Sequence, residues 1–370
     1  MASLLFITHV KKDNTSGVWK KTLAQRAAFE RLGFTVDFVY ENDNDLVIDT
    51  ANSVKQISLK HRYLFFFNLS QNINKKYDFV YLRKPHGGLY PLFASMVINK
   101  VKAINPLCTI YMEIPTYPYD KEQVGLKGFI SNAVYKISLL LYKKNIKEVL
   151  FIGDGPDRIY GINARKISNG VDLNNVSLSQ PYKKNNDTFV FAGIANLMFW
   201  HGYDRLVRSI AHYEGEYRVK CYIIGDSEPE FSRLKSISDE EDPEGRVIFL
   251  GRLADKEIKT VLDEVNICVD ALGRHRSGNN NNSSIKSKEY TAMGMPFIKS
   301  HYDDAFNGDD FYVFQVDANE SNIPIDEIIN WYQTLPDDFP LRERKIAEEK
   351  FSWDEILRPI FNLGKDTKCK

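Results

Sequence analysis

Cysteine is scarce in this sequence, and neither sign of charge prevails. Four cysteines occur among 370 residues, with no Cys-x-x-Cys pair and no cysteine–histidine spacing typical of zinc sites: Cys108, Cys221, Cys268 and Cys369. We interpret them as buried thiols. Because 49 basic residues are balanced by 49 acidic ones, we do not expect a surface that is tuned overall for nucleic acid.

Long apolar runs are also missing. No stretch reaches the roughly 18 apolar residues that a transmembrane helix requires. Residues 1–12 have a strand-like pattern, where a signal peptide would carry a basic start and a long apolar segment. We therefore expect a cytoplasmic protein. Its 370 residues exceed the roughly 250 to 300 that one hydrophobic core usually supports, so we also expect two domains.

Short apolar runs alternate with longer helical stretches along the chain, which is typical of parallel α/β proteins. One series of predicted strands extends from residues 4–8 to 149–152, and a second from 188–192 to 297–299. The polar segment 172–187 is predicted to link them. We expect two Rossmann-like, doubly wound domains, 1–170 and 171–349, facing a central cleft, with a helix at about 350–370 packing back on the first.

The segment 270–299 carries the most informative pattern. A predicted strand ends at Asp270, a loop rich in Gly, Asn and Ser follows, and a helix is predicted to begin at Ser283 or Ser284. The N–H groups and positive dipole end of such a helix suit a phosphate. Basic residues add charge there: Arg274, His275, Arg276 and Lys286. Glu289 lies roughly 7 Å further along the helix, within reach of a ribose diol. A solvated basic loop before an ordinary helix would show the same pattern.

A glycine and a histidine mark the start of the second domain. Gly193 directly follows the predicted strand 188–192, where it would allow close approach of a ligand, and the next loop carries His201 beside Trp200. There is no G-x-G-x-x-G, and no acidic residue ends the second strand for an NAD ribose, which disfavours a dinucleotide oxidoreductase. His201 could equally be a helix-start residue packed against Trp200.

Six further segments occur in order along both halves: SGVWKKTLAQ, YLRKP, EIPTYPYDKE, ISNGVD, FWHGYDRL, and LGRHRSG followed by IKSKEYTAMGMPFI. With them the chain resembles a family 4 (group 1) glycosyltransferase of the GT-B fold, in the bacterial branch that builds capsular, exopolysaccharide or glycoprotein glycans. The resemblance implies a nucleotide-sugar donor on the second domain and a glycan or lipid-linked acceptor on the first. It also implies retention of anomeric configuration without a metal or other cofactor.

The resemblance also implies roles for single residues. Glu289 matches the second glutamate of the family's E-x7-E motif, which holds the donor ribose. The backbone N–H groups at the helix start meet the diphosphate, and two glycine-containing loops approach the phosphates and the base edge. The donor-site residues implied in this way are Gly17, Gly251, Arg252, Leu253, Ile285, Lys286 and Glu289, and the patterns described above add Gly193, Arg274 and Ser284.

Two departures from the family pattern affect the catalytic group. Asn281 stands where the family's first glutamate would be; it can bind sugar hydroxyls but supplies no carboxylate charge. His201 and an uncharged residue near Ile194 stand where many relatives carry an arginine and a lysine, and we expect Arg274 and Arg276 to restore that charge. The expected catalytic residues are Glu289, Arg276, His201 and Asn281.

Candidates for acceptor binding lie at the ends of first-domain strands. Arg83, Glu113 and Tyr117 could bind acceptor hydroxyls. A turn fixed by prolines, with Glu113 capping a helix, would also explain the last two. His9 could contact sugar or simply pack.

The stretch 126–147 has five lysines and no acidic residue, with apolar residues at helical spacing. Such a helix can lie on an anionic membrane, or it can pack its apolar face on the sheet and leave its lysines in water.

Two alternatives to a transferase also stay open. One is a non-catalytic partner subunit of the same fold, and the other is a sugar-nucleotide epimerase.

Overall fold

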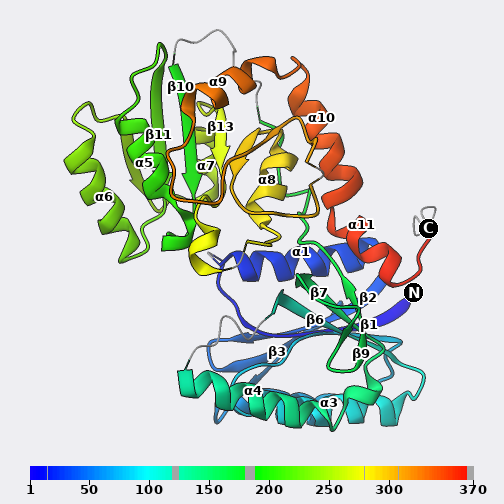
Figure 1. Cartoon of the computed structure of the whole chain (residues 1–370). Coiled ribbons are helices and arrows are strands. Elements are labelled where there is room, and N and C mark those ends of the chain that lie inside the picture. The colour runs from blue at the N-terminus through cyan, green and yellow to red at the C-terminus, as the bar shows by residue number, and fades with distance from the viewer. Residues whose placement is uncertain (15, 119–124, 180–187, 279, 307, 365–370) are drawn as a thin grey trace. The chain divides into compact units, whose positions relative to one another are not determined.

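A computed structural model describes the chain except for residues 15, 119–124, 180–187, 279, 307 and 365–370. The chain divides into two compact units (Figure 1). Unit 1 comprises Met1–Asp172 and Trp353–Lys370, and unit 2 comprises Leu173–Ser352. Cys369 and the second half of the predicted linker lie outside the described residues.

Unit 1 is built on a nine-stranded sheet in the order β4-β3-β2-β1-β5-β6-β7-β9-β8. Its five central strands pair in parallel, whereas β3 and β4 extend one edge as an antiparallel hairpin, and β8 pairs with β9 in the antiparallel sense. The strands are β1 (Ala2–Lys11), β2 (Phe34–Asn42), β3 (Asp45–Asp49), β4 (Val54–Ser58), β5 (Phe79–Arg83), β6 (Thr109–Tyr117), β7 (Glu148–Gly153), β8 (Arg158–Ile159) and β9 (Ile162–Lys166).

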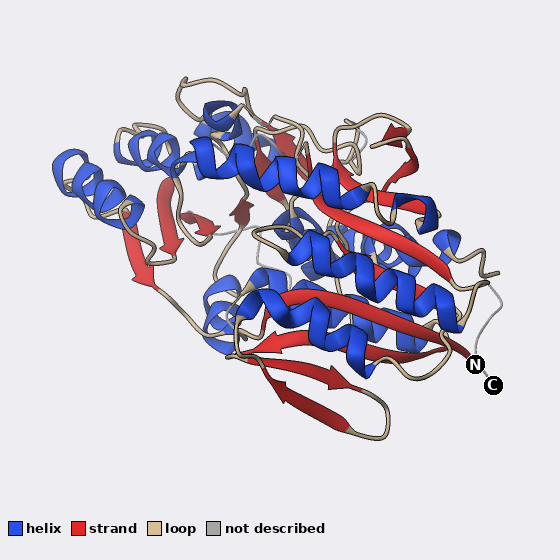
Figure 2. Cartoon of the chain, turned by 90° about the horizontal axis from the view of Figure 1, so that it is seen from below, coloured by secondary structure: helices blue, strands red, loops and turns tan. Residues whose placement is uncertain are grey.

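Successive residues of β1 point to opposite faces of the sheet, so each face has its own core. Leu5 and Ile7 pack with α2 (Phe65–Asn72), α3 (Tyr90–Ile104) and α4 (Gly125–Leu139). Leu4 and Phe6 pack with α1 (Gly17–Arg31), α11 (Trp353–Leu357) and the short helix η7 (Arg358–Ile360). Figure 2 shows helices lying along the strands. Two further short helices, η1 (Arg62–Leu64) and η3 (Lys143–Asn145), complete the unit.

The C-terminal segment of unit 1 is held by both charge and aromatic packing. Arg31 of α1 donates two hydrogen bonds to Asp354 of α11, at 2.7 and 2.9 Å. The Phe361 ring packs at 4.9 to 5.7 Å from four rings of the sheet and α1: Phe29, Phe34, Phe79 and Tyr111. The last described segment therefore completes the core on one face of the sheet.

Unit 2 has a six-stranded, all-parallel sheet in the order β12-β11-β10-β13-β14-β15. The strands are β10 (Thr188–Ile194), β11 (Arg218–Ile224), β12 (Val247–Gly251), β13 (Ile267–Val269), β14 (Phe297–Lys299) and β15 (Val313–Gln315). The helices are η4 (Phe199–His201), α5 (Tyr203–Ala211), α6 (Glu230–Glu241), α7 (Asp255–Leu262), η5 (Arg274–Ser277), α8 (Ile285–Met293), α9 (Ile325–Thr334), α10 (Phe339–Ile346) and η6 (Ala347–Phe351).

Both sheets contain a point where the order of the strands reverses. In unit 2 the chain runs outward from β10 through β11 to β12, and then returns to the other side of β10 with β13. In unit 1 the same reversal lies between β1 and β5. Ligands of such sheets bind beyond the carboxyl ends of the strands at this switch point. The topology therefore marks one candidate site in each unit.

Candidate functional site

The candidate site of unit 2 is centred on the start of α8. Ser284, the residue before this helix, is extended (φ −71°, ψ 132°), and its side chain does not cap the N–H groups of the first turn. Its hydroxyl hydrogen-bonds Asp270 instead. Gly294, with φ 70°, ends the helix. The predicted phosphate-binding residues Ser284, Ile285 and Lys286 thus occupy the cap and first turn, beside the loop that follows β13.

Asp270, directly after β13, holds the first turn of α8 in place. Its carboxylate accepts a 2.5 Å hydrogen bond from the Ser287 hydroxyl and lies 3.2 Å from Lys286 Nζ. Burial acts to raise the pKa of Asp270, but Lys286, His301 and the two serine hydroxyls hold it well below its usual range. A fixed carboxylate therefore orients the Lys286 ammonium, whose own pKa burial lowers.

His201 lies at the other side of the switch point, at the end of η4. The Met198 backbone N–H donates to its Nδ1 at 3.1 Å, and its ring stacks on Tyr203 with centroids 5.6 Å apart. Burial, followed by the charges of Lys286 and Arg274, lowers the pKa of His201 to about 2. The imidazole is therefore neutral, and because Nδ1 accepts a hydrogen bond, its proton resides on Nε2. His201 can offer an N–H donor but no positive charge.

Gly193 has a packing role that the sequence analysis did not predict. A Cβ atom at this position would lie 2.9 Å from the Tyr203 ring. Two further glycines, Gly202 and Gly273, approach each other so closely that a Cβ on Gly202 would lie 2.5 Å from the Gly273 nitrogen. These contacts bring the loops after β10 and β13 together. The ligand-approach role predicted for Gly193 stays a prediction.

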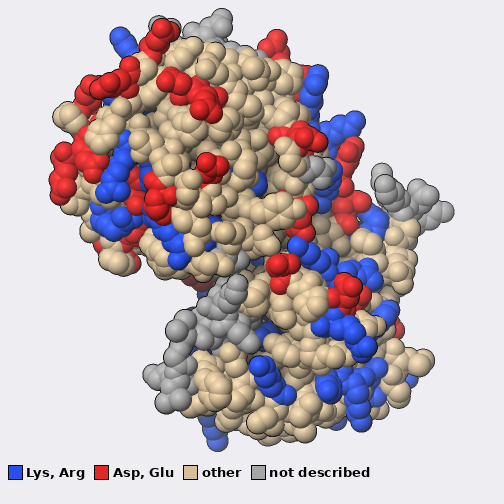
Figure 3. All heavy atoms as spheres, viewed as in Figure 1, with Lys and Arg blue, Asp and Glu red and all other residues tan. Residues whose placement is uncertain are grey.

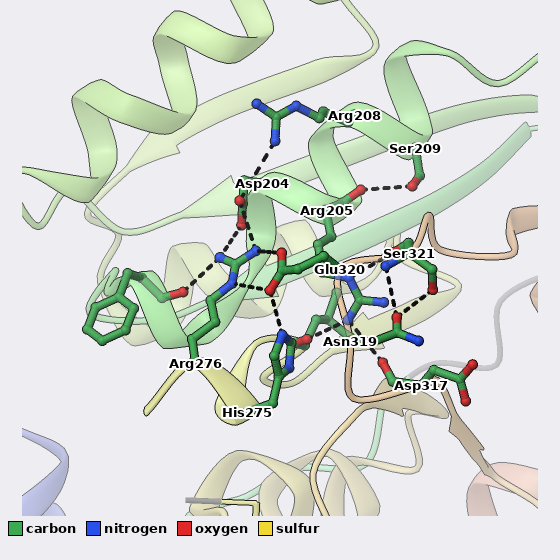
Figure 4. Close-up of polar contacts among 12 residues, drawn as sticks. Asp204, Arg205, Arg208, Ser209, His275, Arg276, Asp317, Asn319, Glu320 and Ser321 are labelled. Atoms are coloured by element: carbon green, nitrogen blue, oxygen red, sulfur yellow. Dashed lines mark hydrogen bonds and ion pairs between the residues drawn. The ribbon is translucent and has the colours of Figure 1, made fainter. Parts of the chain in front are cut away.

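Arg276 is held in an ion-pair cluster within unit 2 (Figure 4). Its guanidinium donates to the Asp204 carboxylate at 2.8 and 3.0 Å, to Glu320 at 2.5 and 2.9 Å, and to the Phe199 carbonyl at 3.1 Å. These partners, Glu320 first, raise the pKa of Arg276. Arg276 thus clamps η5, α5 and the segment around residue 320 together. Its guanidinium is already occupied, which weighs against the diphosphate contact predicted for it.

The other predicted donor-site residues surround the start of α8 or lie on neighbouring loops. Glu289 is half-buried on α8, and its charge acts on Lys286 one turn earlier. Asn281 forms an isolated parallel bridge with Tyr302. The Arg274 guanidinium lies 5.9 Å from the centre of the Trp200 ring. Their contacts with a donor stay predictions.

The loops predicted to meet the base and the phosphates have open surroundings. Gly251 ends β12 with φ 64°, and no atom lies within 4 Å of the position that a Cβ would occupy there. The same open space surrounds Gly17 at the start of α1. Arg252 is exposed and Leu253 is half-buried. The space beside both glycines is therefore open, and their contacts with a donor stay predictions.

Glu113 is a buried hub of unit 1. Its carboxylate accepts hydrogen bonds from Lys21 at 2.9 Å, Gln25 at 2.6 Å and Tyr81 at 2.7 Å, and Arg83 Nη1 lies 3.5 Å away. Burial acts to raise its pKa, but Lys21 and Arg83 bring it down to about 2. Glu113 therefore ties α1 to β6. The Glu113 side chain is only 1% exposed, which leaves almost no carboxylate surface for the predicted acceptor contact. Its hydrogen-bond partners given above are side chains, so they do not include the helix N–H groups that a cap would bind.

The remaining acceptor candidates lie at strand ends. Arg83 is the last residue of β5, and Tyr117 is the last residue of β6, where its half-buried ring lies 5.7 Å from Phe151. Tyr117 precedes a cis peptide bond to Pro118, and the rest of its sequence segment, from 119 on, lies outside the described residues. Neither residue's acceptor contact is tested by this geometry.

Within the described residues, no group of three or more His, Cys, Asp or Glu side chains is placed to hold a metal ion. Nor does this part of the chain contain a helix that is long and apolar enough to span a membrane. Asp270 was not predicted as a site residue, although its position at the end of a predicted strand was a usable signal. Tyr203 carried no such signal, because its contacts with Gly193 and Lys286 depend on the fold.

Comparison with known structures identifies the fold. Sucrose-phosphate synthase from Thermosynechococcus elongatus matches with a TM-score of 0.66 at 14% identity, covering 98% of each chain. Anabaena HepE in complex with UDP matches with a TM-score of 0.65 at 14% identity, covering 98% of this chain and 99% of that one. The catalytic domain of starch synthase IV from Arabidopsis thaliana, bound to ADP and acarbose, matches with a TM-score of 0.66 at 10% identity, covering 98% of each. The fold is GT-B, as predicted.

Part of unit 2 also matches a known protein family. The family model described as "Glycosyl transferases group 1" matches residues 177–302. This range includes η4, η5 and the whole of α8, and with them Asp270, His201 and Lys286. No curated protein matches the chain. A large part of unit 2 therefore matches the glycosyl transferases group 1 model, in a chain of GT-B fold.

Proposed function

We propose that this protein is a retaining, metal-independent family 4 glycosyltransferase. It transfers a sugar from a UDP- or GDP-sugar to a glycan or lipid-linked glycan in bacterial polysaccharide or glycoconjugate synthesis. The observation that carries the proposal is the start of α8, where the first-turn N–H groups, Lys286 and the neutral His201 converge at the switch point of unit 2. The group 1 family match over this region and the nucleotides named with two structural neighbours support it.

In the proposed reaction the bond between the anomeric carbon and the leaving phosphate oxygen breaks first, through an oxocarbenium-like state. The acceptor oxygen then bonds to the same face of that carbon, and its proton passes to the departing diphosphate. The protein supplies no nucleophile. Its task is to stabilise negative charge that builds on the diphosphate, where one well-placed donor contributes about 3 kcal/mol.

Three groups at the start of α8 fit that task. The N–H groups of Ile285 and Lys286 lie in the first turn, at the positive end of the helix dipole. Lys286 Nζ adds a full charge that Asp270 orients at 3.2 Å, and His201 adds a neutral Nε2–H donor. Glu289, further along the same helix, is proposed to bind the ribose.

The experiment that tests this function follows donor consumption and product stereochemistry in the presence of EDTA. Purified protein is incubated with UDP- and GDP-sugars and candidate glycan acceptors, and the anomeric configuration of the product is read by NMR. We expect release of the nucleoside diphosphate, a product with the donor's configuration, and no effect of EDTA. An inverted product or loss of turnover in EDTA would overturn the mechanism. Conversion of the free nucleotide sugar without an acceptor would point to an epimerase.

A membrane contact through α4 is part of the proposal, because the helix exposes apolar side chains next to lysines. Phe129 and Ile137 on α4 are 72% and 66% exposed, and Leu140, directly after the helix, is 62% exposed. Tyr135 and Leu139 alternate with them and pack into the unit 1 core, so the helix both packs on the unit and leaves an apolar strip outside. Lysines flank this strip at positions 136, 143, 144 and 147. The lower part of Figure 3 shows basic side chains and hardly any acidic ones. Residues 119–127 contribute no described side chains.

Each lysine near an anionic membrane surface contributes about 1 kcal/mol, and exposed apolar side chains insert below the headgroups. Flotation with anionic vesicles at low salt should carry the wild-type protein upward. Ile137→Glu should reduce this binding, whereas Val54→Glu, a matched control at an apolar residue of β4 that is 58% exposed, should not. Wild-type protein that stays at the bottom of the gradient with every vesicle would refute the contact.

A further inference from the structure

The switch point of unit 1, between β1 and β5, gathers basic and histidine side chains. His9 lies near the carboxyl end of β1, and Arg83 is the last residue of the neighbouring β5. The His86 ring, from the loop after β5, packs 4.9 Å from the His9 ring. Arg62, from η1, donates from Nε to the Tyr90 hydroxyl at 3.3 Å, and the Tyr90 ring lies 5.0 Å from His9. Four nitrogen-bearing side chains therefore share one end of the sheet.

Two buried nitrogens in this group have no hydrogen-bond partner among the described residues: His9 Nδ1 and Arg83 Nη1. The nearest carboxylate to Arg83 Nη1 is Glu113, at 3.5 Å, and Glu113 already accepts three shorter hydrogen bonds. Buried polar atoms are nearly always paired in native proteins, because an unpaired one costs about 1 to 3 kcal/mol. A ligand that fills these two positions would remove that cost.

The charges around the cluster leave an excess of positive potential. Arg62, Arg83 and Lys84 face it, and the carboxylates nearby are Glu113, shared with Lys21, and Glu41, which interacts with Arg62 and Tyr90. Burial lowers the pKa of His86 to about 4, with Lys84 and Arg83 adding to the effect. Burial also lowers the pKa of His9, and the neighbouring His86, Arg83 and Arg62 side chains lower it further. The directions of these pKa shifts agree with the geometry, in which basic side chains outnumber carboxylates at this end of the sheet.

We propose that the switch point of unit 1 is a binding site for an oxyanion, a phosphate or carboxylate group, that Arg62 and Arg83 hold while His9 Nδ1 accepts a hydrogen bond from a hydroxyl of the same ligand. The inference rests on the proposed function in one respect: the oxyanion is then a group carried by the acceptor, such as a sugar phosphate or an acidic sugar. The other source of the same chemistry is the diphosphate of the donor.

Arg62 is the residue to perturb, because it is exposed and its removal leaves the core intact. Binding of inorganic phosphate to the whole protein is measured by calorimetry, with and without saturating UDP. Arg62→Gln should weaken binding by about fivefold to tenfold, the effect of one charge-assisted hydrogen bond. Lys60→Gln, an exposed charge two positions away, is the matched control and should change binding less than about twofold. His9→Phe keeps an aromatic ring in place but removes Nδ1, and should weaken binding by about threefold or more.

The outcomes separate this inference from the proposed function. Phosphate binding that persists under saturating UDP and weakens in Arg62→Gln supports a site of its own in unit 1. Absence of phosphate binding, or equal weakening by Lys60→Gln, overturns it. Phosphate that UDP displaces, together with weaker UDP binding by Arg62→Gln, assigns the cluster to the donor diphosphate and also overturns it. Donor turnover without phosphate binding would refute the oxyanion site in unit 1 but would not contradict the proposed glycosyltransferase function.

Discussion

Replacing Lys286 by methionine removes a positive side-chain charge at the start of α8. Its Nζ lies 3.2 Å from Asp270 and 3.3 Å from the Tyr203 hydroxyl, and its side chain is 21% exposed. Methionine retains most of the length and the apolar stem of the side chain, but it loses the contact of the ammonium group with the Tyr203 ring at 5.6 Å. The change therefore isolates the ammonium group.

Two magnitudes follow from this geometry. If Lys286 stabilises charge on the leaving diphosphate, its loss should lower kcat by about 10²- to 10³-fold, as for one oxyanion-stabilising donor. The effect on stability should be smaller, about 1 to 3 kcal/mol, because Asp270 keeps the hydrogen bonds from Ser287 and from the Ala271 N–H. Adding Asp270→Asn should recover stability without recovering turnover.

The assay compares kcat for donor turnover with the thermal midpoint of unfolding for each variant. Lys288→Met is the control, because Lys288 lies two residues further along α8, pairs with Asp303 in full burial and touches no predicted ligand. It should lower the free energy of unfolding by about 3 to 5 kcal/mol. Folded Lys288→Met protein should still turn over donor. A Lys286→Met variant with wild-type kcat at saturating donor would refute the role assigned to Lys286.

Three further changes test how buried charges affect the stability of each unit by itself. Arg276→Ala leaves the buried Asp204 carboxylate with fewer partners, so we expect unfolding to become easier by about 1 to 3 kcal/mol; an unchanged thermal midpoint would contradict the clamp. Glu113 has a pKa of about 2 in the fold against an ordinary value of 4.5, so it contributes about 3 kcal/mol above pH 4.5 that is lost as pH falls toward 2. Glu113→Gln should reduce this loss of stability at low pH, as followed by circular dichroism. An unchanged pH dependence would contradict the stabilising role of the Glu113 carboxylate. Glu343 is fully buried and neither carboxylate oxygen has a partner among the described residues, and burial raises its pKa well above 4.5. The unfolded chain releases this proton above pH 4.5 and the folded one retains it, so stability falls as pH rises; Glu343→Gln should be more stable than wild type at pH 8 by about 1 to 3 kcal/mol but not at pH 4, and equal curves at both pH values would refute this.

Much of the architecture was predictable from periodicity. The predicted strands 188–192 and 297–299 correspond to β10 and β14, and the helix predicted to begin at Ser283 or Ser284 is α8, beginning at Ile285. These elements are short buried strands and a helix with a serine before it and a glycine after it, which are strong local signals. The hairpin β3–β4 was not predicted, because β4 is mostly exposed and lacks an apolar period.

The candidate site was predictable in position but not in its contacts. A helix start after a strand indicates an anion site in any parallel sheet. The pairing of Arg276 with Glu320, however, joins residues 44 positions apart, and no local pattern encodes it. Glu113 shows the same limit, since its partners Lys21 and Gln25 lie on α1, 92 and 88 positions earlier. Ligand contacts were predicted for Arg276 and, beside a helix cap, for Glu113, but the ion pairs that both side chains form within the fold could not be predicted.

Nucleoside diphosphate binding tests the central claim most directly. UDP, GDP and ADP are titrated by calorimetry and by thermal unfolding into the wild-type protein and into Lys286→Met. We predict that at least one of them binds the wild type, raising its stability by about 2.7 kcal/mol at a 100-fold excess over the dissociation constant, and that Lys286→Met binds it at least tenfold more weakly. If none of the three binds, or if Lys286→Met binds equally well, the start of α8 is not the diphosphate site of a glycosyltransferase.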